Sequence, residues 1–280
     1  MERRLPPELI DCIVDHLFND IPTLTSIRFT NRTFNLSCRR YIFRTVNLDT
    51  PRRYALKSQI EKFEQLLASS PSIVSFIKEL TLCLADHMFN DHSSPELNDA
   101  ISHLLRQLTQ IAVFDFGSEP VTQWKDWPSA IRSAIKIPLS SPCLTSVGIF
   151  GLQGVATSLF DACPTLEHLT LVAVTFEDDR SNAMQYRPCL RSLHLISSDP
   201  DPLPRGLPVD LTRLQQLRIV YRSSGFLDGA WFWKEFLEPV SKTLETLDFS
   251  QLGMYMIFRS RVLILLTIFC RHRHCESGRF

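Results

Sequence analysis

Residues 163–171 read Cys-Pro-Thr-Leu-Glu-His-Leu-Thr-Leu, with leucines at positions 166, 169 and 171. This apolar-x-x-apolar-x-apolar motif occurs seven times, as Ile77/Leu80/Leu82, Ile111/Phe114/Phe116, Leu144/Val147/Ile149, Leu166/Leu169/Leu171, Leu190/Leu193/Leu195, Leu214/Leu217/Ile219 and Leu244/Leu247/Phe249. The alternation that ends each motif is typical of a strand, because successive strand side chains point to opposite faces. The motifs therefore predict seven short strands.

The motifs start 34, 33, 22, 24, 24 and 30 residues apart along the chain. The middle spacings fall within the period of roughly 20–29 residues of leucine-rich repeats. From Leu144 to Phe249, and less regularly before it, the chain resembles an irregular leucine-rich-repeat solenoid. The resemblance implies an α/β fold with parallel strands and a helical outer layer. The alternative is ordinary α/β connectivity in which the motifs arose by chance.

One family feature is absent from these repeats. The family pattern often places Asn or Cys eight residues after the first leucine, where the side chain binds the turn backbone. Those positions here hold Ala85, Glu119, Leu152, Val174, Ser198, Arg222 and Leu252. Since this ladder is missing, we expect other contacts to satisfy the turns.

Segments whose apolar residues have helical spacing lie before or between several of the motifs. This spacing predicts helices at residues 54–67, 97–108, 127–135 and 230–237. The segment from 254 onward lacks the motif and is very apolar, with Phe258, Val262, Leu265, Leu266 and Phe269 on one face of an expected helix. It is interpreted as a cap on the last repeat or as a non-native extension.

The first fifty residues predict three short helices. The first runs from Pro6 to Leu17, a second starts near Pro22 with Leu24, Ile27 and Phe34 on its inner side, and a third covers Leu36 to Phe43. So small a unit has a marginal core and usually needs a partner or a neighbouring domain.

This N-terminal stretch resembles an F-box of the kind found in large fungal families. The resemblance rests on residues 5–17 (LPPELIDCIVDHL), 23–27 (TLTSI) and 39–44 (RRYIFR), and Phe34 stands where many F-boxes carry Trp. It implies a module that docks onto the Skp-type adaptor of a cullin–RING (SCF) ubiquitin ligase. The implied adaptor-binding residues are Leu5, Pro6, Leu9, Ile10, Ile13, Leu17, Leu24 and Ile27. The alternative is a helical cap in which these residues form only an internal core.

The resemblances together predict an F-box at 1–50, degenerate repeats at 51–253 and an apolar basic tail at 254–280. The polar residues that flank the strand leucines form the candidate target-binding surface. They are His168, Thr170, Ser192, His194, Gln216, Arg218, Thr246 and Asp248. A merely solvated face is the alternative for each of them.

The implied function is a substrate-recognition adaptor of an SCF ligase, with an unknown protein target and no cofactor. A repeat scaffold without a ligase role is the second reading, and an enzyme with an unrecognised site is the third. No Gly-rich phosphate loop, HExxH or GxSxG motif occurs, so we expect no catalytic activity. The close spacing of Cys270, His272, His274 and Cys275 makes one tetrahedral zinc site awkward, and no metal site is predicted.

The distribution of charge along the chain limits the classes of partner that we expect. Lys+Arg and Asp+Glu are both 30, so the net charge is zero. The first 53 residues carry 9 basic and 6 acidic side chains (+3), residues 54–253 carry 16 and 23 (−7), and residues 254–280 carry 5 and 1 (+4). An acidic body argues against nucleic-acid targets.

The cysteines and the apolar runs of the sequence predict where in the cell the protein is located. No export signal is visible, so the eight cysteines, six of them within apolar stretches, are expected as free, buried thiols in a reducing compartment, the cytoplasm and/or the nucleus. The longest apolar run, Val262 to Cys270, is too short to cross a bilayer, which needs roughly 20 residues. We therefore expect no membrane partner.

Overall fold

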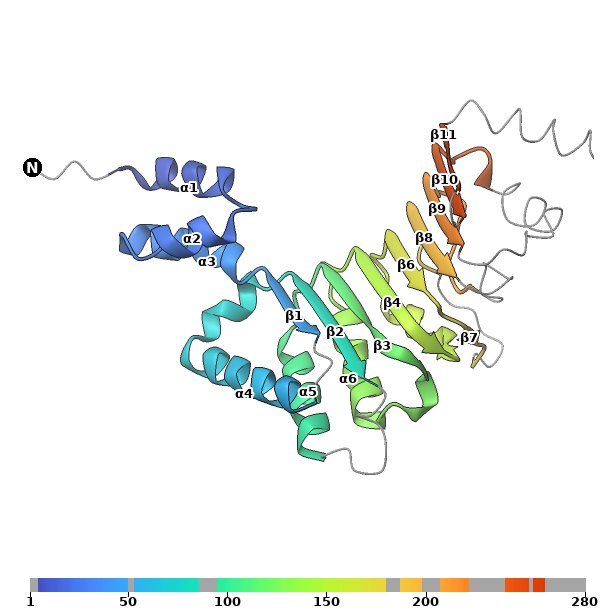
Figure 1. Ribbon diagram of the computed structural model, residues 1–280, viewed down its shortest axis with the longest axis horizontal. Helices are drawn as coiled ribbons and strands as arrows, with labels where there is room; N and C mark the ends of the chain where they lie inside the picture. The colour runs from blue at the N-terminus through green and yellow to red at the C-terminus, as the bar shows by residue number, and fades with distance from the viewer. Residues whose placement is uncertain are drawn as a thin grey trace, which may run out of the picture.

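The computed structural model describes residues 5–49, 53–85, 95–179, 187–197, 207–221, 240–251 and 254–259. Within them the protein is α/β, with a nine-stranded sheet in the order β1-β2-β3-β4-β6-β8-β9-β10-β11 (Figure 1). The strands are β1 (Thr45–Asp49), β2 (Glu79–Ala85), β3 (Val113–Gln123), β4 (Ser146–Gln153), β6 (His168–Val172), β8 (Ser192–Ser197), β9 (Gln216–Tyr221), β10 (Thr246–Gln251) and β11 (Met254–Arg259). Neighbouring strands pair in parallel except β10 and β11, which are antiparallel.

All seven predicted strands are confirmed, and their motifs lie in register. The middle apolar residues Val147, Leu169, Leu193, Leu217 and Leu247 are paired across neighbouring strands. They are buried, as are the leucines that precede each strand, so the motif faces one continuous core. The strands that carry the motif pair in the order in which they occur in the chain, because each repeat can bury its apolar side only against the next repeat.

Strand β1 was not predicted, although the sequence carried its signal. Phe43, Val46 and Leu48 have the motif spacing, but Phe43 was assigned to the end of the third helix. Val46 and Leu48 pair with Leu80 and Leu82 of β2, and Phe43 packs against the main core. The prediction went wrong because helical and strand periods overlap in so short an apolar run.

Three helices, α4 (Arg53–Ser69), α5 (Pro95–Gln107) and α6 (Ser129–Leu139), lie on one side of the sheet at its β1–β4 end (Figure 1). They confirm three of the predicted inter-strand helices, and the fourth, at 230–237, lies outside the described residues. The short 3-10 helices η1 (Pro71–Phe76), η3 (Trp124–Asp126) and η4 (Thr157–Ala162) lie between these helices and the strands along the chain. We call the side of the sheet that faces away from the helices the open face.

The turns after β4 and β6 show what replaces the missing Asn or Cys ladder. Leu152 and Val174, which occupy the ladder positions, are buried apolar residues. The backbone closes the turns instead: Thr175 N–H donates to the Leu152 carbonyl at 3.1 Å and Val155 N–H donates to the Thr175 carbonyl at 2.9 Å. These bonds lead into a second, two-stranded sheet of β5 (Val155–Ala156) and β7 (Phe176–Glu177).

The N-terminal helices are α1 (Pro7–His16), α2 (Ile21–Ile27) and α3 (Arg32–Ile42), and we call them the helical module. They pack around their own small core of Ile10, Val14, Leu24 and Cys38. Phe34 lies on α3 and not, as predicted, on the second helix. The Asn31 side chain accepts a hydrogen bond from Thr33 N–H at 2.9 Å, and this N-cap starts α3 before Phe34.

The helix expected from residue 254 onward is not formed at its start. Residues 254–259, including Phe258, form β11, whose backbone pairs with β10 from Gln251↔Met254 to Thr246↔Arg259. The edge of β10 offers hydrogen-bond partners along the whole segment, which a detached apolar helix would leave unused. The other four residues of the expected helix face and the Cys/His tail lie outside the described residues.

Candidate functional site

The first candidate surface is on α1, whose circumference divides into three arcs. Successive residues are about 100° apart around an α-helix. Ile10 and Val14 face inward and are buried at 2 % and 0 % exposure. Leu9 and Ile13 point in a different direction and are 52 % and 42 % exposed, and Leu5, just before the helix, is 51 % exposed. The helix therefore has one apolar face for its own core and a second that is left open.

The third arc of α1 is acidic and contacts α3. Asp15 accepts a hydrogen bond from the Tyr41 hydroxyl at 2.8 Å and forms an ion pair with Arg40. Arg40 also lies 3.5 Å from a carboxylate oxygen of Asp11. Since Asp11 and Asp15 lie about 200° around the helix from Leu9 and Ile13, the contacts with α3 leave the exposed apolar face free.

The eight predicted adaptor-binding residues thus separate into two groups. Leu5, Pro6, Leu9 and Ile13 are exposed. Ile10 and Leu24 are buried in the module core, and Leu17 and Ile27 pack partly buried against it. The first group can contact a partner directly, whereas the second supports the shape of the module.

The structure adds four exposed apolar side chains of the module that the sequence reasoning missed. They are Phe18, Ile21, Phe29 and Leu36, and Phe29 is 74 % exposed. Phe29 follows α2, and the guanidinium carbon of Arg28 lies 4.5 Å from its ring centroid. The helical pattern could have pointed to Leu36, but Phe18 and Phe29 lie in turns, where periodicity carries no signal.

The module joins the sheet through a short, hydrogen-bonded connection. Only Phe43 and Arg44 separate α3 from β1. The Arg44 carbonyl accepts hydrogen bonds from Lys78 N–H at 2.9 Å and Glu79 N–H at 3.0 Å. The Arg44 side chain donates to Glu79 at 2.9 Å, and Thr45 donates to the same carboxylate at 2.8 Å. The first strands therefore hold the end of α3 in place.

The second candidate surface is the open face, where the predicted target-binding residues form two straight rows. The first row contains His168, Ser192, Gln216 and Thr246, and the second contains Thr170, His194, Arg218 and Asp248. Parallel pairing brings each residue beside its equivalent on the next strand. The structure thus brings all eight residues together on one surface, with exposures from partly buried to exposed.

A third row of the open face is apolar. Phe150, Val172, Ile196 and Val220 are paired across β4, β6, β8 and β9, and all four are partly buried. This row lies two residues along the strands from the second row, or about 7 Å. The open face therefore places an apolar strip beside its polar rows.

The second row contains an ion pair between Arg218 and Asp248. The Nε of Arg218 lies 3.3 Å from a carboxylate oxygen of Asp248, and the Arg218 side chain is 52 % exposed against 25 % for Asp248. Burial lowers the pKa of His194; Arg218 lowers it further, and Asp248 opposes them with a smaller effect. His194 therefore stays neutral at pH 7 beside a positive Arg218.

The opposite end of the same row is acidic. Asp115 on β3 lies in register with Gly148 on β4, and its carboxylate occupies the space above that glycine. Burial raises the pKa of Asp115, a hydrogen bond from the Gly148 backbone opposes this, and the nearby charge of Glu79 raises the pKa again. None of the ion pairs between described residues includes Asp115.

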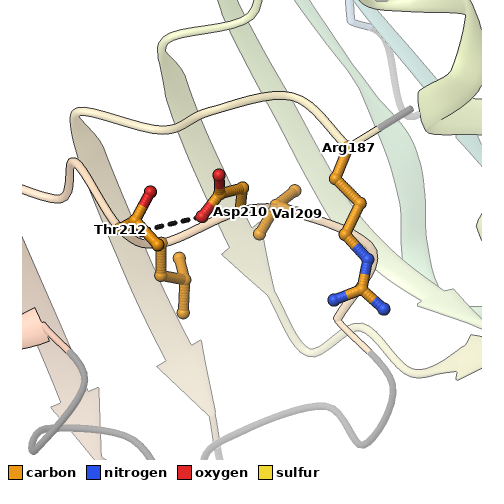
Figure 2. Close-up of a pocket in the computed structure, with 5 residues that line it drawn as sticks. Arg187, Val209, Asp210 and Thr212 are labelled. Atoms are coloured by element: carbon orange, nitrogen blue, oxygen red, sulfur yellow. Dashed lines mark hydrogen bonds between the residues drawn. The ribbon is translucent and has the colours of Figure 1, made fainter.

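A shallow pocket of about 400 Å³ lies away from the open face, beside the segment that leads into β9. It is lined by Arg187, Val209, Asp210, Leu211 and Thr212. Asp210 accepts a hydrogen bond from Thr212 N–H at 2.8 Å, so its carboxylate is turned toward its own loop (Figure 2). The pocket brings no nucleophile and base together, and we assign no chemistry to it.

Six cysteines lie in the described part of the chain. Cys38, Cys83 and Cys163 are free and buried, but Cys12 and Cys143 are free and exposed, so the expectation of buried thiols holds for only some of them. No three His, Cys, Asp or Glu side chains gather there as a metal site would need. No helix in those segments combines the length and apolar character needed to cross a membrane.

Similarity to known proteins does not identify the function of this chain. No protein-family model matches the chain, and no curated protein is similar to it at a significant level.

Proposed function

We propose that this protein is a substrate-recognition adaptor of a cullin–RING (SCF) ubiquitin ligase. The helical module acts as an F-box that docks onto the Skp-type adaptor, and the sheet region acts as an irregular leucine-rich-repeat domain that binds a protein target. The protein is not itself a catalyst in this proposal, and it works in the cytoplasm and/or the nucleus, where the ligase would meet its targets.

The observation that carries the proposal is the second apolar face of α1. Leu5, Leu9 and Ile13 remain exposed although the module has its own core. Exposed apolar side chains in line on one helix are the anchors with which a helix enters an apolar groove. Pro6, Phe18 and Ile21 extend the exposed surface to both ends of α1.

The connection between module and sheet supports the same proposal. An adaptor of this class acts by holding a bound target near the charged ubiquitin carrier, so its contribution is proximity and orientation. The hydrogen bonds around Arg44 couple α3 to β1 and β2. A target held on the open face would consequently keep one position relative to the docked module.

A matched pair of substitutions on α1 tests the docking face. Ile13→Ala removes an exposed side chain and should weaken binding of the purified Skp-type adaptor about tenfold, without changing the melting temperature. Ile10→Ala removes a buried one and should destabilise the module by about 2–4 kcal/mol. Calorimetric titration and thermal unfolding of the full-length chain measure the two effects.

The double variant Leu9→Ala/Ile13→Ala should reduce adaptor binding about a hundredfold. Val121→Ala, on an exposed apolar residue of β3, is the control and should bind normally. If the double variant binds as well as the control, the docking face lies elsewhere. If the folded chain does not bind the adaptor at all, the ligase role is wrong. The chain would then be a repeat scaffold without a ligase role.

A further inference from the structure

The second row of the open face has a charged group at each end of a neutral stretch. Asp115, Gly148, Thr170, His194 and Arg218 follow one another across β3, β4, β6, β8 and β9. The four steps between Asp115 and Arg218 span about 19 Å at the usual separation of neighbouring strands. The residues between them are uncharged at pH 7 because His194 is held neutral.

Each end of this row favours an incoming group of opposite charge. At the negative end the charge of Glu79 acts on Asp115, and Glu79 is itself ion-paired with Arg44. At the positive end Arg218 lies beside His194 and forms an ion pair with Asp248 on β10, with its Nε 3.3 Å from the carboxylate. Arg218 is also the more exposed member of its pair.

The apolar row runs parallel to this charged row. Val172, Ile196 and Val220 offer partly buried aliphatic side chains beside the neutral stretch. A bound chain that follows the second row would place aliphatic side chains on this strip. Apolar contact in the centre with charged contacts at the ends is the usual arrangement of a specific interface.

We infer that the open face binds a linear segment of the target that carries a Lys or Arg over Asp115, an Asp or Glu over Arg218 and aliphatic residues between them. An extended chain covers the distance with about six residues, at about 3.3 Å each. The inference rests on the proposed role of the open face as the target-binding surface. Its basis is charge complementarity, which determines specificity more than affinity.

Selection from a phage-displayed library of random 12-residue peptides tests the inference. The bait is the full-length Leu9→Ala/Ile13→Ala chain, so that the exposed apolar face of the module does not capture peptides. Enriched peptides should carry one basic and one acidic residue about six positions apart, with aliphatic residues between them. Their affinity should fall about tenfold when Arg218→Glu is added.

Repeating the selection on charge variants reads out each end separately. Arg218→Glu should enrich peptides with a basic residue at both ends, and the milder Asp115→Asn should remove the preference for a basic residue at one end only. Circular dichroism establishes that each bait is folded. Peptides that lack the charge pair, or that bind Arg218→Glu equally well, would overturn the inference, as would failure to enrich any peptide.

A second copy of the chain is the other possible occupant of this face. Sedimentation showing a dimer that Arg218→Glu dissolves would also overturn the inference. The adaptor titration is independent of these experiments. If peptides fail while the adaptor binds, only this inference is wrong, and if peptides bind while the adaptor does not, only the ligase role is wrong.

Discussion

The ring of Phe150 on β4 lies directly over Gly117 on β3, in the position that a side chain on residue 117 would occupy. The two residues are paired in register near the middle of the sheet. A similar relationship, in the opposite direction between the strands, links Asp115 on β3 with Gly148 on β4. Two glycines therefore let side chains of neighbouring strands lie flat on the open face.

The two glycines should differ in their tolerance of alanine. A Cβ at Gly117 would meet the backbone carbonyl of Phe150 as well as its ring, whereas the three atoms nearest to a Cβ at Gly148 all belong to the Asp115 side chain. The backbone cannot move without disturbing the β3–β4 pairing, but a carboxylate can rotate away. We expect Gly117→Ala to destabilise the protein by about 2–3 kcal/mol and Gly148→Ala by about 1 kcal/mol.

Chemical denaturation of the two variants measures this difference. Adding Asp115→Ala should rescue Gly148→Ala and should leave Gly117→Ala as unstable as before. Equal losses in the two glycine variants would contradict the close approach that the structure describes.

His194 should make the stability of the protein fall in mild acid. Burial and the charge of Arg218 lower its pKa in the folded state below the ordinary value of 6.5, so the unfolded chain takes up the proton more readily. The resulting destabilisation is absent above the unfolded pKa, grows as the pH falls through that value, and is complete below the lowered folded pKa. Asp115, whose pKa is raised, acts in the opposite direction.

A difference measurement separates His194 from the other titrating groups. The stability of the unmodified chain and of His194→Asn is measured by urea denaturation at pH 7.5 and pH 5. Acidification should cost the unmodified chain more than the variant. Equal losses would mean that His194 titrates normally and is not held beside Arg218 as described.

The cysteines should differ in reactivity according to burial. Only the thiolate reacts with alkylating reagents, and burial raises the pKa of Cys83 to about 11 and that of Cys163 to about 12. In the native protein at pH 8, iodoacetamide should label the exposed Cys12 and Cys143 well before Cys83 and Cys163. Peptide mapping by mass spectrometry follows each site, and unfolding in urea should equalise the rates.

Much of the sheet could be predicted because its signal is local and repeated. Seven motifs of the same form predicted seven strands, since the period-2 alternation and the preceding leucine are readable within nine residues. β1 had the same signal in Phe43, Val46 and Leu48, but it directly follows a helix whose apolar residues obscured it. β11 could not be predicted, because an apolar segment next to an open strand edge takes its structure from that edge.

The candidate surfaces were predicted less completely. The two polar rows followed from the motif, because residues between buried leucines must face the other side of the strand. The exposed apolar face of α1 did not follow, since Leu9, Ile10, Ile13 and Val14 are all aliphatic. Phe29 and Phe18 were missed because no periodicity extends into turns.

The sequence by itself determined the order and direction of the seven strands that carry the motif, since each motif repeats a local pattern and a short unit can pair only with its neighbour. It also determined which strand residues are polar and face away from the core. Only the tertiary structure decided which apolar face of α1 stays exposed, because Ile10 and Val14 pack into the module core and Arg40 and Tyr41 of α3 contact Asp15 on another side of the helix. The placement of Asp115 over Gly148, and of Arg218 beside His194 and Asp248 in the second row, was decided in the same way, since it depends on pairing between separate strands.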